Sequence, residues 1–594
     1  MRVEEGFQPV PFQEENTYTS DPVLPNLLKR TLPPSAFQQI EPDLIRLGGE
    51  VITSIRSLGD GNKISPPILT QFDQWGRRVD NLQTSEGWRD LKAVAQKEGI
   101  PGIFYERKFK EHSRVYGFAK MMMMVGDAHE VFCPLSMTDG SARVIELIGN
   151  PEMKKKMLPR LISRDPSFAF TAGQWMTERP GGSDVSRTET TAVYTGKNHS
   201  FGPKYSLNGF KWFSSATDSE VSVALARTGT IEDGSRGLSL FLVPLRLPLL
   251  RGPSDPPSSP VSNNIFVHRL KNKIGTHALP TAELTLSSTE AYLMGELNQG
   301  IKNITPVLNI TRLWSAATSV GNLRKCLSIA TAYAKVRSIR GGSQLLQDTP
   351  IHVAQLASIN LLYRALTHLT FGVISLLGKS ECGVATIDEL RRLRMLTPVA
   401  KAFAAEKACA GMEEAMVALG GAGYMEENGI GRSIRDALVE KIWEGTAVVL
   451  ALDLARSAQD RESMESFTSW ANRVISSAPS DLQENLQRPL DLLKNALEEL
   501  RTTYTQPLPP LIPRPALMLV ASITSSVYLL EHAIWSKTTQ GHSGEVDMEV
   551  FRRWVLEGGT AAAIEDVKEA KEGMKNRIDI NSAITFGNNR KARM

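Results

Sequence analysis

Two short stretches of the sequence combine the side chains that a planar ring ligand requires. The first, residues 175–184, reads W-M-T-E-R-P-G-G-S-D and holds two hydroxyls, Thr177 and Ser183, beside two glycines. Glycines let backbone N–H groups approach a ligand closely because no Cβ stands in the way, and hydroxyls can donate to carbonyls or ring nitrogens. Taken alone, this stretch is equally compatible with an ordinary surface loop.

The second stretch, residues 208–215, reads N-G-F-K-W-F-S-S and begins with Asn-Gly, the strongest short signal for a hairpin. The aromatic-rich run that follows is typical of a strand. Residues two apart on a strand point to the same face, so Trp212 and Ser214 are predicted to share one. A flat aromatic side chain beside a hydroxyl suits a planar heteroaromatic ligand.

A third stretch supplies a candidate base. Residues 441–446 read K-I-W-E-G-T, so Glu444 follows two apolar residues and precedes Gly445. Apolar neighbours desolvate a carboxylate and raise its pKa toward neutrality, and a glycine lets a substrate lie close to the backbone. By itself, a glutamate before a glycine is also typical of an exposed helix end.

The 594 residues that carry these stretches predict three or four domains by length alone. About the first 40 residues, rich in Pro, Gln and Ser, are predicted to be extended, and helices follow them. Short apolar runs between Gly, Pro, Ser and Asn predict strands in the middle of the chain, after which helical periodicity returns. The predicted domains are an N-terminal extension and helical domain at 1–167, a β domain at 168–295, a helical bundle at 296–456 and an appended helical domain at 457–594.

Composition places the chain among globular proteins, with 41% apolar and 22% charged residues. The net charge of +4 is small for this length and gives no global electrostatic case for nucleic acid or a membrane. The four cysteines are far apart, which predicts reduced thiols and no metal site. We find no unbroken apolar run of about 18 residues, no signal or transit peptide and no terminal S-K-L, so no membrane span and a cytoplasmic location are expected.

Residues 118–125 read F-A-K-M-M-M-M-V, which is apolar on every side and predicts a buried helix. Methionine is most often adaptable core filler, because its unbranched side chain fits irregular gaps. A lining for a substrate tunnel is the alternative interpretation of the same run.

The three stretches together resemble the motifs of the acyl-CoA dehydrogenase superfamily. Its members carry a T-E-x-x-x-G-S-D loop and a G-x-K-W-x-[ST] strand that enclose the isoalloxazine ring of FAD, and an I-x-E-G-T sequence that holds the base. The resemblance implies an α+β multidomain fold with an N-terminal helical domain, a central antiparallel β-barrel or sandwich and a C-terminal four-helix bundle. The last predicted domain is then an extra C-terminal helical domain.

By this resemblance, Glu444 removes the α-proton of an acyl thioester while hydride leaves the β-carbon for flavin N5, and Gly445 contacts the substrate. In some members the base instead precedes an invariant arginine; the matching position here is Thr311, before Arg312, and threonine cannot serve as that base. The residues expected to contact FAD are Met176, Thr177, Gly182, Ser183, Trp212, Phe213, Ser214, Arg337, Gly420, Gly421 and Thr446.

Two of these segments imply a homo-oligomer. Residues 420–424 read G-G-A-G-Y and resemble a loop that binds the adenosine half of FAD from a neighbouring subunit. Arg337 resembles an arginine that reaches the FAD pyrophosphate across the same interface, which suits its forked donors. The family commonly forms dimers and tetramers. The sequence departs from the usual pattern at Val417, where Gln or Glu is common, and at 337–341, where R-x-x-F-G reads R-S-I-R-G.

Within the superfamily the likeness is strongest to the AidB branch, flavoproteins of the adaptive response to DNA alkylation. Three hypotheses stay open: an FAD-dependent acyl-CoA dehydrogenase, an acyl-CoA oxidase that passes electrons to O₂, or an AidB-like DNA-associated flavoprotein with little dehydrogenase activity. From Arg456 onward the chain has 17 Lys and Arg and 18 Asp and Glu residues, a balance that gives DNA binding little support. The acyl chain and the electron acceptor are not specified by the sequence.

Overall fold

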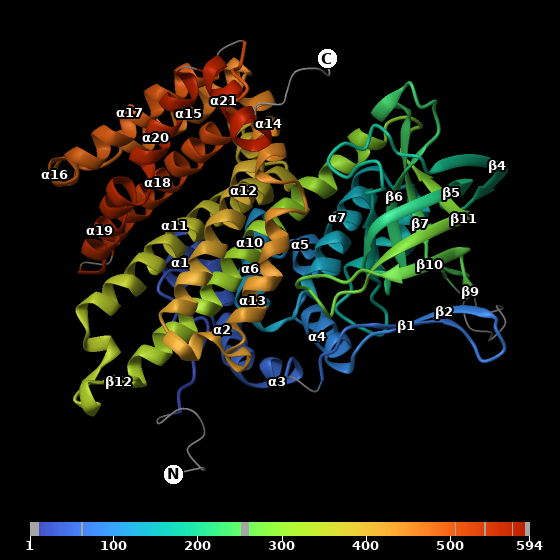
Figure 1. Cartoon of the computed structure of the whole chain (residues 1–594), viewed down its shortest axis with the longest axis horizontal. Helices are drawn as coiled ribbons and strands as arrows, with labels where there is room; N and C mark the ends of the chain where they lie inside the picture. The colour runs from blue at the N-terminus through green and yellow to red at the C-terminus, as the bar shows by residue number, and fades with distance from the viewer. Residues whose placement is uncertain are drawn as a thin grey trace.

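The computed structural model describes residues 11–60, 63–250, 261–504, 507–539, 542–572 and 574–587. Figure 1 shows helices gathered on one side of the molecule and the large sheet on the other, with helix α7 (Phe132–Ile148) between them. The C-terminal helices, orange to red, lie against the central bundle. The predicted order of helical, β, helical and appended helical domains is therefore confirmed as a fold, whereas the exact domain boundaries stay predictions.

Helices of the N-terminal domain begin at Leu24, which corrects the prediction of an extended lead-in of about 40 residues. Pro25 and Pro34 stand in the first turns of α1 and α2. A proline there favours a helix, because its φ is already helical and its missing N–H is not needed. The helices are α1 (Leu24–Thr31), α2 (Pro34–Glu50), α3 (Arg56–Leu58), α4 (Glu86–Lys97), α5 (Gly102–Glu106), α6 (Ser113–Met124), α7, α8 (Pro151–Lys156) and α9 (Leu158–Leu161).

Ion pairs attach the irregular residues before α1 to the rest of the protein. Arg56 pairs with Glu14 at 2.8 Å and with Asp127 at 2.9 Å. Asp127 in turn pairs with Lys325 of the central bundle at 2.5 Å. Glu14, Asp127 and Lys325 are buried, and a buried charge is tolerated when it is paired in this way.

The methionine run lies in α6, as a buried helix. Met121, Met122, Met123 and Met124 are each at most 1% exposed and belong to the main hydrophobic core. The prediction of a buried helix is confirmed. Whether any of these side chains also contacts a substrate stays a prediction.

The middle domain is a seven-stranded sheet whose strands close into a ring. In it, β11 (Thr281–Met294) pairs with β5 (Gly202–Ser215), β5 with β4 (Thr191–His199), β4 with β6 (Val221–Arg227), β6 with β7 (Leu238–Pro244), and β7 with β11. Strands β10 (Ile265–Leu270) and β3 (Ala172–Trp175) extend it. The pairs are antiparallel except β3 with β6 and a single bridge between β4 and β6, so the predicted barrel is confirmed with two parallel exceptions.

Three small hairpins complete the strands. Strands β1 (Ile68–Phe72) and β2 (Arg78–Gln83) form an arm that reaches from the N-terminal domain along the sheet in Figure 1. The arm is fixed there because Gln71 and Arg78 donate to the carbonyl of Val267 at 2.8 and 2.5 Å. The other two pairs are β8 (Arg246–Leu247) with β9 (Val261–Ser262) and β12 (Ser338–Ile339) with β13 (Gln344–Leu345).

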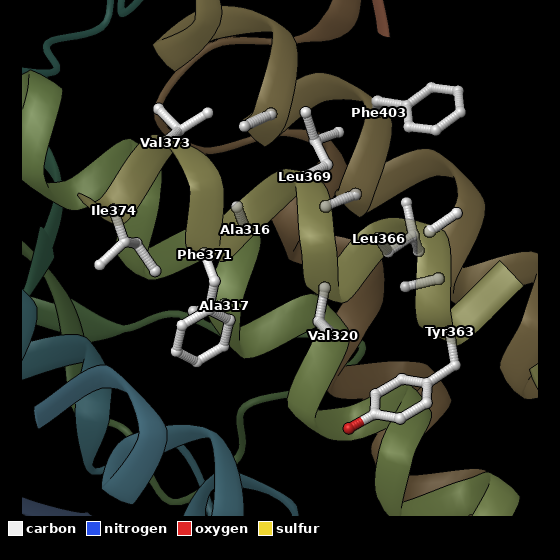
Figure 2. Packing of buried hydrophobic residues seen from close by; sticks show 14 of the residues in the cluster. Ala316, Ala317, Val320, Tyr363, Leu366, Leu369, Phe371, Val373, Ile374 and Phe403 are labelled. Atoms are coloured by element: carbon white, nitrogen blue, oxygen red, sulfur yellow. The ribbon is translucent and has the colours of Figure 1, made fainter. Parts of the chain in front are cut away.

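The C-terminal domain is the predicted helical bundle. Its long helices are α10 (Gly300–Val336), α11 (Pro350–Glu381) and α12 (Ile387–Val417), and its shorter helices are α13 (Ile430–Ala437) and α14 (Ala447–Ala458). Figure 2 shows the small residues Ala316, Ala317 and Val320 of α10 beside Leu366 and Leu369 of α11. All five are fully buried, which fixes the long helix α10 on which several site residues stand.

The appended domain is also helical. Its helices are α15 (Arg461–Ser476), α16 (Ser480–Asn485), α17 (Gln487–Thr503), α18 (Pro513–Thr539), α19 (His542–Glu557), α20 (Thr560–Lys571) and α21 (Met574–Phe586). Helix α18 packs on α11, α12 and α14. The approach is close, because a Cβ added at Gly372 of α11 would lie 2.3 Å from the ring of Tyr528.

Two helices among the described residues, α11 and α18, are long and apolar enough to cross a membrane by length and composition. The most apolar windows of these helices are 72% and 78% buried inside the protein. Both pack against other helices of the bundle and the appended domain, which is typical of core helices. The sequence prediction considered only unbroken apolar runs, which polar residues interrupt in both.

Two buried histidines, one on α11 and one on α18, join the appended domain to the bundle. The rings of His368 and His532 have their centres 4.5 Å apart. Burial lowers the pKa of His368 well below its usual value and lowers the pKa of His532 to about 3, and Arg30 and Arg364 act in the same direction. The carboxylate of Asp547 on α19 lies 3.6 Å from His532 Nε2, so an acidic group also adjoins the two histidines.

These histidines predict a loss of stability in acid. The folded protein keeps both rings neutral, whereas the unfolded chain protonates them near pH ~6.5, so their contribution is complete above that pH and falls below it. We expect the free energy of unfolding to fall by roughly 1 kcal/mol per pH unit for each ring. Thermal unfolding from about pH 8 to about pH 5 measures this, and His532→Gln should reduce the slope. An unchanged slope in that variant would contradict the assignment.

Candidate active site

The loop at 176–184 and strand β5 are joined by their backbones and by a buried ion pair. The N–H of Trp212 donates to the carbonyl of Thr177 at 3.0 Å. The residues next to these two also pair, because Lys211 Nζ lies 2.6 Å from Glu178 Oε1. The Lys211 side chain is 0% exposed and the Glu178 side chain 2%. The structure therefore brings together Thr177 and Trp212, which the sequence had placed in two separate stretches.

Glu178 also fixes the far end of the loop. Its carboxylate accepts hydrogen bonds from the backbone N–H groups of Glu189 at 2.6 Å and Thr190 at 3.3 Å. Lys211 donates a second bond to the carbonyl of Leu225 on β6 at 2.8 Å. The pair is thus hydrogen-bonded on both sides, which a buried charge pair requires.

The glycines keep the loop tight and open toward a ligand. A Cβ added at Gly181 would lie 2.3 Å from the carbonyl oxygen of Asp184, and one at Gly182 would lie 3.1 Å from Thr177 Cγ2. A side chain at Gly181 therefore has no space. Met176 and Thr177 are half-buried, whereas Gly182 and Ser183 are exposed, so backbone and hydroxyl groups of this loop are accessible.

Strand β5 carries a bulge that corrects the prediction of strict alternation at Trp212 and Ser214. Lys211 pairs with Leu284 and Ser214 pairs with Ala282, so two residues of β5 stand opposite one residue of β11. Lys211 and Ser214 are both fully buried, while Trp212 is half-buried and Phe213 is 49% exposed. A bulge cannot be recognised from the alternation of residue types on which that prediction rested.

The candidate base stands on a strained loop between η10 (Leu438–Lys441) and α14. Glu444 has φ +58 and Gly445 has φ +106, and the first value is unusual for a residue with a side chain. Thr311 Oγ1 donates to Glu444 Oε2 at 2.6 Å. Arg312 Nε donates to the carbonyl of Glu444 at 3.3 Å, and Lys401 Nζ to the carbonyl of Gly445 at 2.6 Å.

The surroundings of Glu444 adjust its acidity. Burial raises the pKa of this carboxyl above its ordinary value, while the Thr311 hydroxyl and the charges of Arg312 and Lys401 act in the opposite direction. A carboxylate whose pKa is raised toward the working pH is a better proton acceptor than an exposed one. The Glu444 carboxyl is therefore chemically suited to accept a weakly acidic proton.

Comparison with known protein families identifies the first three of the four domains. Residues 298–459 match the acyl-CoA dehydrogenase C-terminal domain, residues 173–289 match the acyl-CoA dehydrogenase middle domain, and residues 7–166 match the adaptive response protein AidB N-terminal domain. Together these matches cover well over half of the chain.

The chain is also similar over most of its length to individual proteins. It is 35% identical to acyl-CoA dehydrogenase family member 11 of Caenorhabditis elegans over 561 residues, which is 91% of this chain and 87% of that protein. This chain belongs to the acyl-CoA dehydrogenase family.

Two further similarities locate this enzyme in the AidB-like branch. It is 27% identical to the putative acyl-CoA dehydrogenase AidB of Escherichia coli K12, over 82% of this enzyme and 87% of AidB. The crystal structure of C. elegans ACDH-11 in complex with C11-CoA is 33% identical, covers 99% of this enzyme and 98% of that chain, and superposes with a TM-score of 0.88.

The family uses FAD, and this enzyme is an FAD-dependent member of it. The structure fits a flavin ring at the loop and strand described above. Ser214 Oγ is buried and has no hydrogen-bond partner among the described residues, so a bound ring that offers an acceptor would satisfy it. Thr177 and Trp212 lie side by side in the same region, where Lys271 Nζ is 3.4 Å from the centre of the Trp212 ring.

The residues predicted for the adenosine half of FAD lie elsewhere in this enzyme. Arg337 follows the end of α10, and Gly420 and Gly421 begin the turn η8 (Gly420–Tyr424). All three are exposed, and a Cβ added at either glycine would meet no atom within 4 Å. No hydrogen bond between described residues joins them to the loop at 176–184. Thr446, by contrast, directly follows the base loop as the N-cap of α14.

Two cavities of about 530 and 650 Å³ lie away from the site. The first is beside His199 and Tyr292 on the sheet, and the second is between α10, α11 and α19. Neither is lined by the candidate base or by the loop at 176–184. The assignment of the site therefore rests on its side chains and their contacts.

Proposed function

We propose that this enzyme oxidises the bond between the α and β carbons of an acyl-CoA, with Glu444 as the base. The observation that carries the proposal is the Glu444 carboxyl, which burial makes more basic and which Thr311 holds at a single oxygen. A relative 33% identical was solved with C11-CoA, which supports an acyl-CoA of that kind as the substrate.

Different residues of this chain have separate roles in the proposed reaction. Thr311 hydrogen-bonds Glu444 Oε2, and no hydrogen bond from a described residue reaches Oε1, which is therefore available to take the α-proton. FAD, when bound, supplies the acceptor for the hydride that leaves the β-carbon. Gly445 offers its backbone to the thioester, since no side chain stands there. The ring would be held by Met176, Thr177, Gly182, Ser183, Trp212, Phe213, Ser214 and Thr446.

A homo-oligomer is part of the proposal. Arg337, Gly420 and Gly421 are exposed in a single subunit, although the family motif assigns them to the adenosine half of FAD. A second copy of the chain would bring them to that cofactor. Light scattering of the FAD-bound enzyme tests this, and Arg337→Ala should lower flavin retention. A monomer that retains FAD fully would contradict the shared site.

The direct test is anaerobic titration of the purified, flavin-containing enzyme with short-, medium- and long-chain acyl-CoAs, C11-CoA among them. Bleaching of the visible flavin band by one chain-length class supports the proposal and identifies the substrate class. A bound flavin that no acyl-CoA reduces would overturn it. If one acyl-CoA does reduce the flavin, oxygen consumption by the enzyme with that substrate distinguishes an oxidase from a dehydrogenase.

Replacing Thr311 with valine should shift the pH dependence of flavin reduction. The hydroxyl lowers the pKa of Glu444, so its loss raises that pKa, and the ionised base then appears only at higher pH. We expect the acid limb of the rate profile to move upward, with a smaller change at the alkaline plateau. Thr305→Val is the matched control, because Thr305 is exposed on the same helix. A profile that moves to lower pH, or does not move, would contradict the contact.

DNA binding by the appended domain receives little support from the structure. Most of its basic side chains that the structure describes are paired with acids nearby, which leaves no concentrated basic face for phosphates. Representative pairs are Arg552–Glu549 at 2.6 Å, Arg553–Glu557 at 3.0 Å and Lys568–Glu565 at 2.9 Å. We expect no salt-dependent shift of duplex DNA. A shift that weakens steeply with added salt would restore the DNA-associated hypothesis.

A further inference from the structure

The backbone of the base loop adopts a conformation that its sequence does not favour. Glu444 has φ +58, a left-handed value that a side chain makes costly, and Gly445 continues with φ +106. Such a conformation persists only where the surrounding structure holds it. The side chains that hold the residues on either side of Glu444 are therefore informative.

One contact holds the residue before the base. Trp443 Nε1 donates to Glu440 Oε2 at 2.6 Å, and Ser315 on α10 donates to the same oxygen at 2.5 Å. Glu440 is 1% exposed, and its second oxygen, Oε1, has no hydrogen-bond partner among the described residues. This buried carboxyl has no role in the proposed proton removal, which leaves its position unexplained.

A second contact holds the residue after the base. Lys401, 1% exposed on α12, donates from Nζ to the carbonyl of Gly445 at 2.6 Å. Nζ makes no other hydrogen bond to a described residue. Glu444 therefore lies between two fixed residues. On one side, Glu440 of η10 and its contact with α10 hold Trp443. On the other side, Lys401 of α12 holds Gly445.

We propose that Glu440 and Lys401 are positioning residues that hold the strained loop on both sides of Glu444. The inference rests on the proposed function, because it assigns them to the placement of that base. A displacement of about 1 Å of a reacting group costs about 100-fold in rate, so a pair that fixes the loop has a large effect without contacting the substrate.

The charges of the pair agree with this role. Burial raises the pKa of Glu440 to about 7 and lowers the pKa of Lys401 to about 8. The charged groups around them are each other, Glu444, Arg312, Glu406 and, on the segment before α7, Glu130, whose own pKa Glu440 helps to raise. The pair therefore changes charge near neutral pH, which gives the loop a pH signature separate from that of the base.

Glu440→Leu and Trp443→Phe test the contact. The first removes the acceptor of both donors, and the second removes the N–H donor together with part of the ring. We expect each to slow acyl-CoA-dependent flavin reduction by about 10–100-fold while the acyl-CoA dissociation constant changes less than about threefold. The double variant should be little worse than Glu440→Leu alone, because that substitution already removes the contact that Trp443→Phe breaks. Glu440→Leu should also remove the ionisation near neutral pH from the rate profile.

A readout without substrate separates this inference from the proposed function. Amide hydrogen exchange of residues 439–447 should be faster in both variants than in the wild type, whether or not an acyl-CoA reduces the flavin. The matched control is Glu427→Leu, at an exposed glutamate of the same domain. Unchanged exchange with flavin reduction within twofold of wild type would overturn the positioning role. A wild type that no acyl-CoA reduces would overturn the proposed function alone.

Discussion

Glu444→Gln is expected to abolish the reduction of bound flavin by acyl-CoA while the enzyme keeps its FAD. General-base catalysis contributes about 10²–10⁴-fold to such a rate, and glutamine keeps the shape of the side chain but cannot accept the proton. Its amide can still contact the Thr311 hydroxyl, which donates to Oε2 of the native carboxylate. The loop and the flavin site should therefore stay intact.

Anaerobic stopped-flow reduction with the best acyl-CoA of the panel measures this effect. The visible spectrum of each variant shows whether flavin is present, so loss of cofactor is distinguished from loss of the base. Glu427→Gln is the control, because that glutamate is exposed and has no assigned part in the proposed chemistry. If Glu444→Gln reduces its flavin at a rate close to wild type, another group removes the proton and the assignment is wrong.

Short-range sequence patterns indicated each part of this site that lies on a single stretch. The residues around Thr177, Trp212 and Glu444 indicated a flavin loop, a strand and a base; the strand is confirmed, and the other two stay predictions. The structure then placed Thr177 against Trp212. The charged residues next to them, Glu178 and Lys211, could have been used in the prediction. Two opposite charges in motifs that lie side by side suggest an ion pair.

Contacts between distant stretches had no such signal. Lys401 is separated from Gly445 by 44 positions, and Ser315 from Glu440 by 125, so no spacing rule connects them. The bulge in β5 and the helical start of the N-terminal domain were missed for another reason. Both features depend on the local backbone conformation that the tertiary structure selects. The residue types alone are compatible with more than one such conformation.

Lys211→Met is expected to destabilise the middle domain and lower its FAD content. Breaking a buried ion pair by removing one partner typically costs about 3–5 kcal/mol. The effect should lie at the lower end of that range, because Glu178 would keep its bonds from the N–H groups of Glu189 and Thr190. Flavin retention should fall as well, since Lys211 and Glu178 directly adjoin Trp212 and Thr177.

Glu178→Leu should cost more than Lys211→Met, because it leaves the N–H groups of Glu189 and Thr190 without their acceptor and the buried ammonium with only the Leu225 carbonyl. The double variant should recover part of that loss, since it leaves no charge unpaired. Urea unfolding and flavin absorbance measure the two effects separately. The control is Lys204→Met on the same strand. The Lys204 side chain is 31% exposed, so its ion pair with Glu290 should contribute at most about 1 kcal/mol to stability. Equal losses for Lys204→Met and Lys211→Met would show that the buried pair does not hold the flavin loop to its strand.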